Sequence, residues 1–155
     1  SSGTTTFEVA RQLRTRSNLT VITNSLLVIN ELASAANITL VTLGGILRRS
    51  EFSMIGHITE QALAELRADK VIIGIRAIDS THGLTNDYLP ETMTDRAILR
   101  SGRTVIVAAD HTKCERMAPA FVAPVSAMHM LITDTDAPLA FVEALREQGV
   151  QVLTV

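Results

Sequence analysis

The sequence predicts an α/β protein in which helices cover both faces of a mostly parallel sheet. Short apolar segments typical of strands alternate with segments whose apolar residues recur at helical spacing. The strand segments, such as residues 71–73, are almost wholly apolar, as expected where both faces of a sheet are covered. The 155 residues suffice for one core, and no linker or repeat divides them. We therefore expect one domain over residues 1–155.

Runs of β-branched and other apolar residues predict six strands. They cover residues 20–23, 39–43, 70–75, 104–109, 129–133 and 151–154. The second run ends at Gly44-Gly45, which favours a turn. The last run closes the chain, and we expect it at an exposed edge of the sheet.

Apolar residues that repeat every three or four positions predict five helices between these strands. They cover residues 7–13, 26–36, 58–66, 93–98 and 141–149. Gly102 is suited to end the fourth of them. Residues 76–90 carry neither period, so we expect a long loop there.

The chain opens with a hydroxyl-rich loop, Ser1-Ser2-Gly3-Thr4-Thr5-Thr6, that leads into the first helix. The first amides of a helix have no partner within the helix, and its dipole adds partial positive charge there. Gly3 lets the backbone approach a ligand closely. This combination predicts an anion site, most commonly for phosphate. The alternative is an ordinary cap, in which one hydroxyl binds the helix amides.

In open parallel sheets, ligands bind outside the carboxyl ends of the strands. Polar residues follow the predicted strands at those ends: Thr23-Asn24-Ser25, Gly44-Gly45 with Arg48 and Arg49, Arg76 with Asp79 and residues 85–88, Asp110-His111-Thr112-Lys113, and Thr133-Asp134. Each group has a structural alternative, because capping residues and turns are common where strands meet helices. Their convergence on one edge predicts a polar pocket.

Composition excludes several classes of function. The net charge is −2 and no run of Lys or Arg occurs, so this chain alone is not expected to grip nucleic acid. The apolar runs are too short to span a membrane, and we see no signal peptide. The single cysteine, Cys114, favours a reducing compartment such as the cytoplasm. The four histidines show no metal-binding spacing, and no cofactor motif is present.

Several short motifs occur in an order that resembles the C-terminal effector-sensing domain of DeoR-type bacterial transcriptional regulators. They are Ser2-Gly3-Thr4-Thr5, Thr23-Asn24, Gly44-Gly45 with Leu47-Arg48, Gly74-Ile75, Gly83-Leu84-Thr85 and Asp110-His111-Thr112-Lys113. The resemblance covers essentially the whole chain. It implies a fold similar to ribose-5-phosphate isomerase, a phosphorylated sugar effector, a homo-oligomer, and a preceding winged helix-turn-helix that binds operator DNA. A strand directly before Ser1 is also expected, since the opening loop must be delivered to the sheet edge.

The resemblance also implies roles for individual residues. Ser2, Gly3, Thr4 and Thr5 would hold the phosphate, Asn24, Gly44 and Gly45 would line the pocket, and Lys113 would supply positive charge. With the other polar residues at the strand ends, the predicted ligand-binding set is Ser2, Gly3, Thr4, Thr5, Thr6, Asn24, Gly44, Gly45, Arg48, Arg76, Asp79, Asn86, Asp110 and Lys113. Ser1 stands where the family often has Asp, and Cys114-Glu115 replaces an aromatic residue and Gly.

The expected function is that of a sensing domain of a sugar-metabolism repressor, without catalysis, cofactor or metal. The main alternative is a sugar-phosphate isomerase, which needs a carboxylate base; Asp79, Asp87 and Glu91 are the candidates. A third possibility is a domain that serves only oligomerisation.

Overall fold

A computed structural model describes residues 1–155 and confirms the predicted α/β class with a parallel sheet flanked by helices. The helices are α1 Thr4–Leu13, α2 Leu26–Leu32, α3 His57–Glu65, α4 Leu89–Ser101 and α5 Leu139–Glu147, with short 3-10 turns η1 His111–Lys113 and η2 Val125–Ala127. The strands are β1 Leu19–Thr23, β2 Ile38–Thr42, β3 Ile46–Arg48, β4 Ser53–Ile55, β5 Ala68–Ile73, β6 Ala77–Asp79, β7 Gly83–Asn86, β8 Gly102–Ala108, β9 Ala120–Ala123, β10 Met130–Thr133 and β11 Gln151–Thr154.

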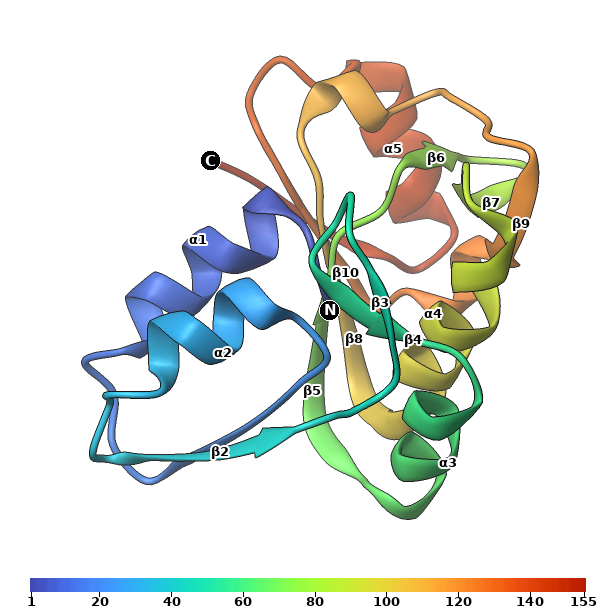
Figure 1. The fold of residues 1–155 in the computed structure, drawn as a ribbon. Coiled ribbons are helices and arrows are strands. Elements are labelled where there is room, and N and C mark those ends of the chain that lie inside the picture. The colour runs from blue at the N-terminus through green and yellow to red at the C-terminus, as the bar shows by residue number, and fades with distance from the viewer.

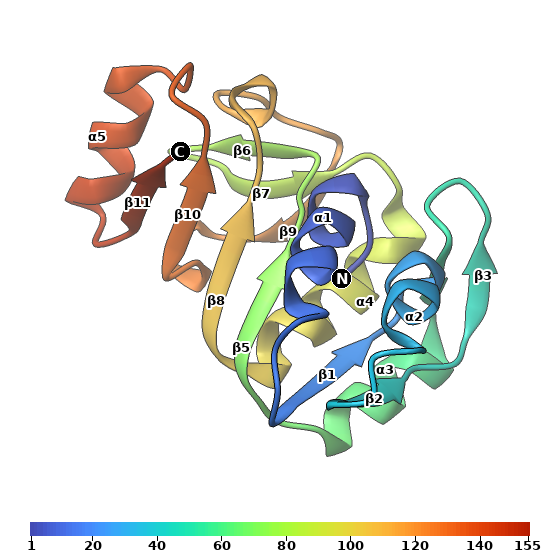
Figure 2. The same ribbon diagram turned by 90° about the vertical axis from the view of Figure 1, so that its left-hand side faces the viewer.

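The central sheet has four parallel strands in the order β11-β10-β8-β5. Helices α1 and α2 lie on one side of it and α3 and α4 on the other, while α5 packs beside β11 (Figures 1 and 2). As predicted, the last strand occupies a sheet edge. None of the helices combines the length and the apolar character needed to span a lipid bilayer.

All six expected strands and all five expected helices are present, with shifted ends. Helix α2 stops at Leu32, before the predicted end at residue 36, because a turn that closes from the Ile38 amide to the Ala35 carbonyl leads into β2. Helix α4 starts at Leu89, four residues earlier than predicted, and Pro90 occupies its first turn.

Five short strands were not predicted from the sequence. Strands β3 and β4 form an antiparallel hairpin, and β6, β7 and β9 form a three-stranded antiparallel sheet. The expected loop over residues 76–90 is therefore wrong, since it holds β6, β7 and the start of α4. Gly83 has a φ of 81°, and a Cβ there would lie 2.4 Å from the Ala123 carbonyl oxygen, so the β7–β9 contact requires glycine.

The core surrounds the parallel sheet. Ile73 of β5, Val107 of β8 and Leu131 of β10 are fully buried, and Phe141 and Leu145 of α5 pack against the same cluster. A smaller cluster of Ala10, Val28 and Leu32 joins α1 to α2. The sheet is thus a rigid platform, and both of its faces are held by apolar packing.

Strands β1 and β2 form a separate parallel pair that is not hydrogen-bonded to the central sheet. Between β1 and the free edge of β5 lies a cavity of about 420 Å³ with mostly apolar walls, closed on one side by α1. We call this cavity the apolar slot; its walls include Val9, Leu13, Val21, Ile22, Val71 and Ile72. The backbone nitrogen of Ser1 lies at the slot, 3.4 Å from the Ile72 carbonyl oxygen.

Candidate functional site

A polar cavity of about 270 Å³ opens at the carboxyl ends of β5 and β8. This is the place where parallel sheets bind ligands. We call it the polar pocket; its walls are Ser1, Ser2, Gly3, Thr4, Thr5, Arg48, Glu51, Gly74, Ile75, Arg76, Asn86, Asp87, Glu91, Asp95, Ala108, Ala109, Asp110 and Lys113. They come from α1, the ends of β5 and β8, the β3–β4 hairpin, β7 and α4.

The N-terminus of α1 faces this pocket without a side-chain cap. Gly3 occupies the N-cap position with a φ of 104°, which favours glycine, and no side chain accepts from the first amides. The hydroxyl of Thr6 instead donates to the Gly3 carbonyl oxygen at 2.9 Å. The first turn carries no acidic residue, so the helix itself does not neutralise the partial positive charge at its N-terminus. This arrangement differs from the ordinary capping alternative and leaves the amides of Thr4 and Thr5 available to an anion.

Lys113 reaches the pocket from η1, the turn that follows β8. Asp110 caps this turn, because its carboxylate accepts from the Thr112 amide at 2.8 Å and from the Thr112 hydroxyl. Those hydrogen bonds hold the pKa of Asp110 below its usual range. Lys113 itself forms no ion pair with any carboxylate of the protein. It is therefore a free positive charge at the pocket wall.

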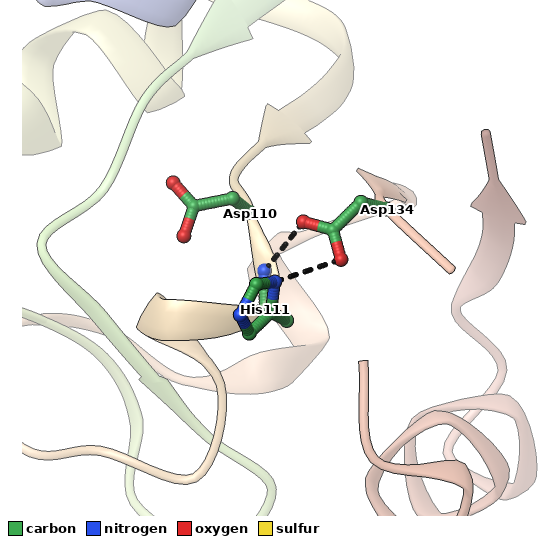
Figure 3. Close-up of side chains that lie close together, drawn as sticks. All are labelled: Asp110, His111 and Asp134. Atoms are coloured by element: carbon green, nitrogen blue, oxygen red, sulfur yellow. Dashed lines mark hydrogen bonds and ion pairs between the residues drawn. The ribbon is translucent and has the colours of Figure 1, made fainter. Parts of the chain in front are cut away.

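A second contact fixes the same turn. His111 donates from its backbone amide and from Nδ1 to the two carboxylate oxygens of Asp134, each at 2.9 Å (Figure 3). The backbone bond from His111 is the main reason why the pKa of Asp134 is lowered. Asp110, His111 and Asp134 lie close enough to share a cation, but they are largely exposed and already bonded within the turn. We assign them the role of holding the turn that carries Lys113.

Another part of the pocket wall is acidic and buried. Glu91 and Asp95 lie one turn apart on α4 and are 5% and 7% exposed. Arg48 Nη1 donates to Glu91 Oε2, and the Ser53 hydroxyl donates to Glu91 Oε1 at 3.2 Å. The amide of Asn86 donates to Asp95 Oδ2 at 2.8 Å. Residues from four elements are thus tied together beside the pocket.

The two arginines of the pocket are engaged by carboxylates. Arg48 pairs with Glu91 and lies 3.9 Å from Asp87, and Arg76 Nε donates to Asp87 at 2.7 Å. The bond to Asp87 raises the pKa of Arg76. Asp95 has no such partner. Burial, and then the nearby charge of Glu91, raise the pKa of Asp95 from 3.8 to about 7.

The structure gathers nine of the fourteen predicted ligand-binding residues around the polar pocket. These are Ser2, Gly3, Thr4, Thr5, Arg48, Arg76, Asn86, Asp110 and Lys113. The other five lie outside it: Thr6, Asn24, Gly44, Gly45 and Asp79.

Each of the five has a structural partner instead. Thr6 is buried against Gly3, and the amide of Asn24 donates to the Met54 carbonyl oxygen at 2.9 Å. The Gly44 carbonyl accepts from the Thr59 hydroxyl, and a Cβ on Gly45 would collide with that same hydroxyl. Asp79 closes a turn by accepting from the amides of residues 81 and 82.

The buried acidic residues were the main omission from the predicted set. Glu91 was predicted only as a candidate base of an isomerase, and no role was predicted for Asp95; Asp87, which belongs to the predicted polar segment 85–88, is exposed. The spacing of Glu91 and Asp95 by four positions places both on one face of a helix, and this was the available signal. Their burial depends on the β3–β4 hairpin and β7, which were not predicted.

The fold is that of an α/β domain with a polar pocket at the carboxyl edge of its parallel sheet. Residues 1–135 match the family model described as the DeoR C terminal sensor domain, so the chain belongs to this family. This confirms the resemblance seen in the sequence.

Curated relatives support the same family membership. A putative aga operon transcriptional repressor of Escherichia coli is 33% identical over 154 residues, which cover 99% of this chain and 57% of that protein. Glycerol-3-phosphate regulon repressors of Escherichia coli and Haemophilus influenzae are 33% and 34% identical, over 96% and 94% of this chain and 59% and 56% of their own lengths. The chain thus spans between half and two thirds of these relatives. They are transcriptional regulators, not enzymes, so the isomerase alternative is not supported.

Proposed function

We propose that the polar pocket binds a phosphorylated sugar or related metabolite and that this binding controls operator DNA binding by another domain of a longer cytoplasmic protein. One observation carries the proposal: the uncapped N-terminus of α1 and the unpaired Lys113 line the same pocket. Backbone amides at a helix end and a nearby ammonium are a recurring pair of phosphate-binding groups.

The size and polarity of the pocket support a small, hydrophilic ligand. Its volume of about 270 Å³ is at the lower end for ligand pockets, which fits a metabolite more closely than a nucleotide. Beyond the anion end, Asn86 and the carboxylates of α4 offer acceptors and donors for sugar hydroxyls.

Control of a distant domain requires that the ligand favour one of two arrangements. The pocket is lined by residues from several separate units: α1, the central sheet, the β3–β4 hairpin and α4. A ligand that contacts all of them stabilises one relative placement. Through a homo-oligomer, this would change the spacing of the DNA-binding domains.

The direct experiment is a thermal-shift panel of sugar phosphates, each paired with its unphosphorylated parent. A ligand at 100 times its dissociation constant stabilises the folded state by about 2.7 kcal/mol. We expect one or more phosphorylated compounds to raise the melting temperature while their parents do not. Equal shifts within every pair, or no shift at all, would contradict the proposal; the latter result would favour a domain that serves only oligomerisation.

We also propose that this chain self-associates and that it does not bind DNA by itself. Exposed apolar side chains on α4 and β9, with Leu89 at 70% and Phe121 at 50% exposure, support an interface between copies. The net charge of −2 argues against DNA binding. Sedimentation at tens of micromolar (about the range where moderate interfaces form) should show more than monomer, and a gel shift with operator DNA should show no complex.

The apolar slot supports one further element of a longer chain. We propose that a strand directly preceding Ser1 lies between β1 and β5. The free edge of β5, the apolar walls, and the backbone nitrogen of Ser1 at Ile72 are the reasons. Such a strand would join the two parallel sheets and deliver the loop at Ser2 to the pocket.

A further inference from the structure

We propose that Asp95 binds an ammonium group of the ligand, so that the effector is a phosphorylated metabolite that also carries an amine. This inference rests on the proposed function, because it concerns the same polar pocket. It goes beyond that function by assigning a second charged group to the ligand and a specificity-determining residue to the protein.

The geometry of Asp95 is that of an incompletely satisfied binding group. Its side chain lines the pocket although the residue is only 7% exposed. Oδ2 accepts from the Asn86 amide, whereas Oδ1 accepts no hydrogen bond from the protein. Oδ1 is accessible from the pocket, and its acceptor sites are free. A donor supplied by the ligand would satisfy Oδ1.

The charges around Asp95 favour a cation as that donor. The arginines near it are already engaged, Arg48 by Glu91 and Arg76 by Asp87. The amino group of Ser1 also acts on Asp95, but burial lowers its pKa to about 6, so it is largely neutral at pH 8. Lys113 is free, but it forms no pair with Asp95. A hydroxyl would supply a hydrogen bond but leave the charge unbalanced. An ammonium would supply both, and hydrogen bonds between ionised groups are the stronger kind.

Two unpaired charges of opposite sign therefore line one small pocket. Lys113, with the amides of α1, suits a phosphate, and Asp95 suits an ammonium. A ligand with both groups would balance both charges, while a simple sugar phosphate would balance only one. Burial raises the pKa of Asp95 to about 7. The same ligand would lower this pKa again, because a neighbouring cation favours the ionised carboxylate.

The experiment compares matched ligands by calorimetric titration at pH 8. The probes are the 6-phosphates of glucosamine, galactosamine and mannosamine, each beside its hydroxy counterpart and its N-acetyl derivative. Within at least one set we expect the amine to bind about tenfold more tightly than both neutral forms, which is the size of one charge-assisted hydrogen bond.

The variant Asp95→Asn keeps the shape and the bond from Asn86 but removes the charge. It should reduce the amine preference to about threefold or less and leave the affinity of the hydroxy compounds nearly unchanged. The matched control is Asp69→Asn, an exposed aspartate outside the polar pocket, which should retain the full preference.

The outcomes separate this inference from the proposed function. If sugar phosphates bind but no amine is preferred, or if Asp95→Asn weakens amine and hydroxy compounds equally, Asp95 does not read an ammonium and only this inference falls. If no phosphorylated compound binds, both fall. A preference that survives in Asp95→Asn would place the amine elsewhere and would also overturn the assignment.

Discussion

Helix α1 borders both cavities of the molecule, and the cavities differ in almost every respect. Its first residues line the polar pocket, while Thr6, Val9, Ala10 and Leu13 line the apolar slot. The slot is the larger, about 420 Å³ against 270 Å³. Size alone would therefore select the slot as the ligand site.

The chemistry of the walls leads to the opposite assignment. The polar pocket contains an uncapped helix end, a lysine without an ion pair, and a buried carboxyl that accepts one hydrogen bond, from Asn86, and has no ion-pair partner. The slot instead borders the free edge of β5 and holds mostly apolar side chains, which is the environment of a strand. The charged and uncapped groups of the polar pocket therefore support our proposal of a ligand site there, whereas the mostly apolar walls beside an open sheet edge support our proposal of a strand in the slot. The slot wall also holds one buried polar atom without a partner, Asn24 Oδ1.

The largest expected effect comes from filling the slot. An N-terminal extension of six residues that alternates Val and Ile should raise the free energy of unfolding by about 2–4 kcal/mol, as buried side chains and backbone bonds exceed the ordering cost. Chemical denaturation measures the change. A Gly-Ser extension of equal length is the control and should have no effect. Equal stability of the two extended chains would contradict the strand assignment.

A smaller effect is expected from Asp95→Asn in the polar pocket. The folded-state pKa of Asp95 is raised from 3.8 to about 7, so its stabilising contribution is complete below pH 4 and lost as the pH rises through 7. The groups that act on it are Glu91, Arg48 and the amino group of Ser1.

Asp95→Asn should therefore raise the free energy of unfolding by about 1–3 kcal/mol at pH 8 and leave it nearly unchanged at pH 4. Thermal unfolding across this range, with Asp69→Asn beside it, measures the difference. A destabilised variant at pH 8 would mean that the ionised carboxylate is well satisfied in the folded protein.

The smallest expected effect is a loss of stability without a loss of ligand affinity, and it tests whether the slot and the polar pocket act independently. Val21→Ala in the wall of the slot should lower the free energy of unfolding by about 1 kcal/mol, since two half-buried methyl groups are lost. Ligand affinity should stay within about twofold, a change below 0.5 kcal/mol. A strong loss of affinity in this variant would show that the ligand, or the shape of its site, depends on the slot.

The sequence predicted the position of a residue correctly where that position follows from a general rule of sheet topology. The opening loop and Lys113 were placed correctly because the carboxyl ends of β5 and β8 meet at one edge of the sheet. The same rule misplaced Asn24 and Gly44, because β1 and β2 form a separate sheet and their polar residues bond to the β4 region and α3 instead.

The burial of Asp95 could not be predicted from the sequence pattern. An acidic residue in the middle of a helix normally faces water, and the four-residue spacing from Glu91 shows only that both share one face of the helix, not that this face is buried. Its environment arises from Arg48 on the β3–β4 hairpin and Asn86 on β7, and the strand pairings β3–β4 and β6–β7 each extend over only three residue pairs. Such short strands leave no readable period, so the contact could only be found in three dimensions.

The proposed function requires that the polar pocket hold a phosphate between the N-terminal end of α1 and Lys113. Calorimetric titration of a phosphorylated ligand and its unphosphorylated parent into Lys113→Ala tests it most directly, with Lys70→Ala, an exposed lysine outside the pocket, as the matched control. We predict a loss of about one to two orders of magnitude for the phosphorylated ligand alone, since a bond to a charged group is worth roughly 1.5–3 kcal/mol. An unchanged affinity for the phosphorylated ligand, or equal losses for both ligands, would contradict the account.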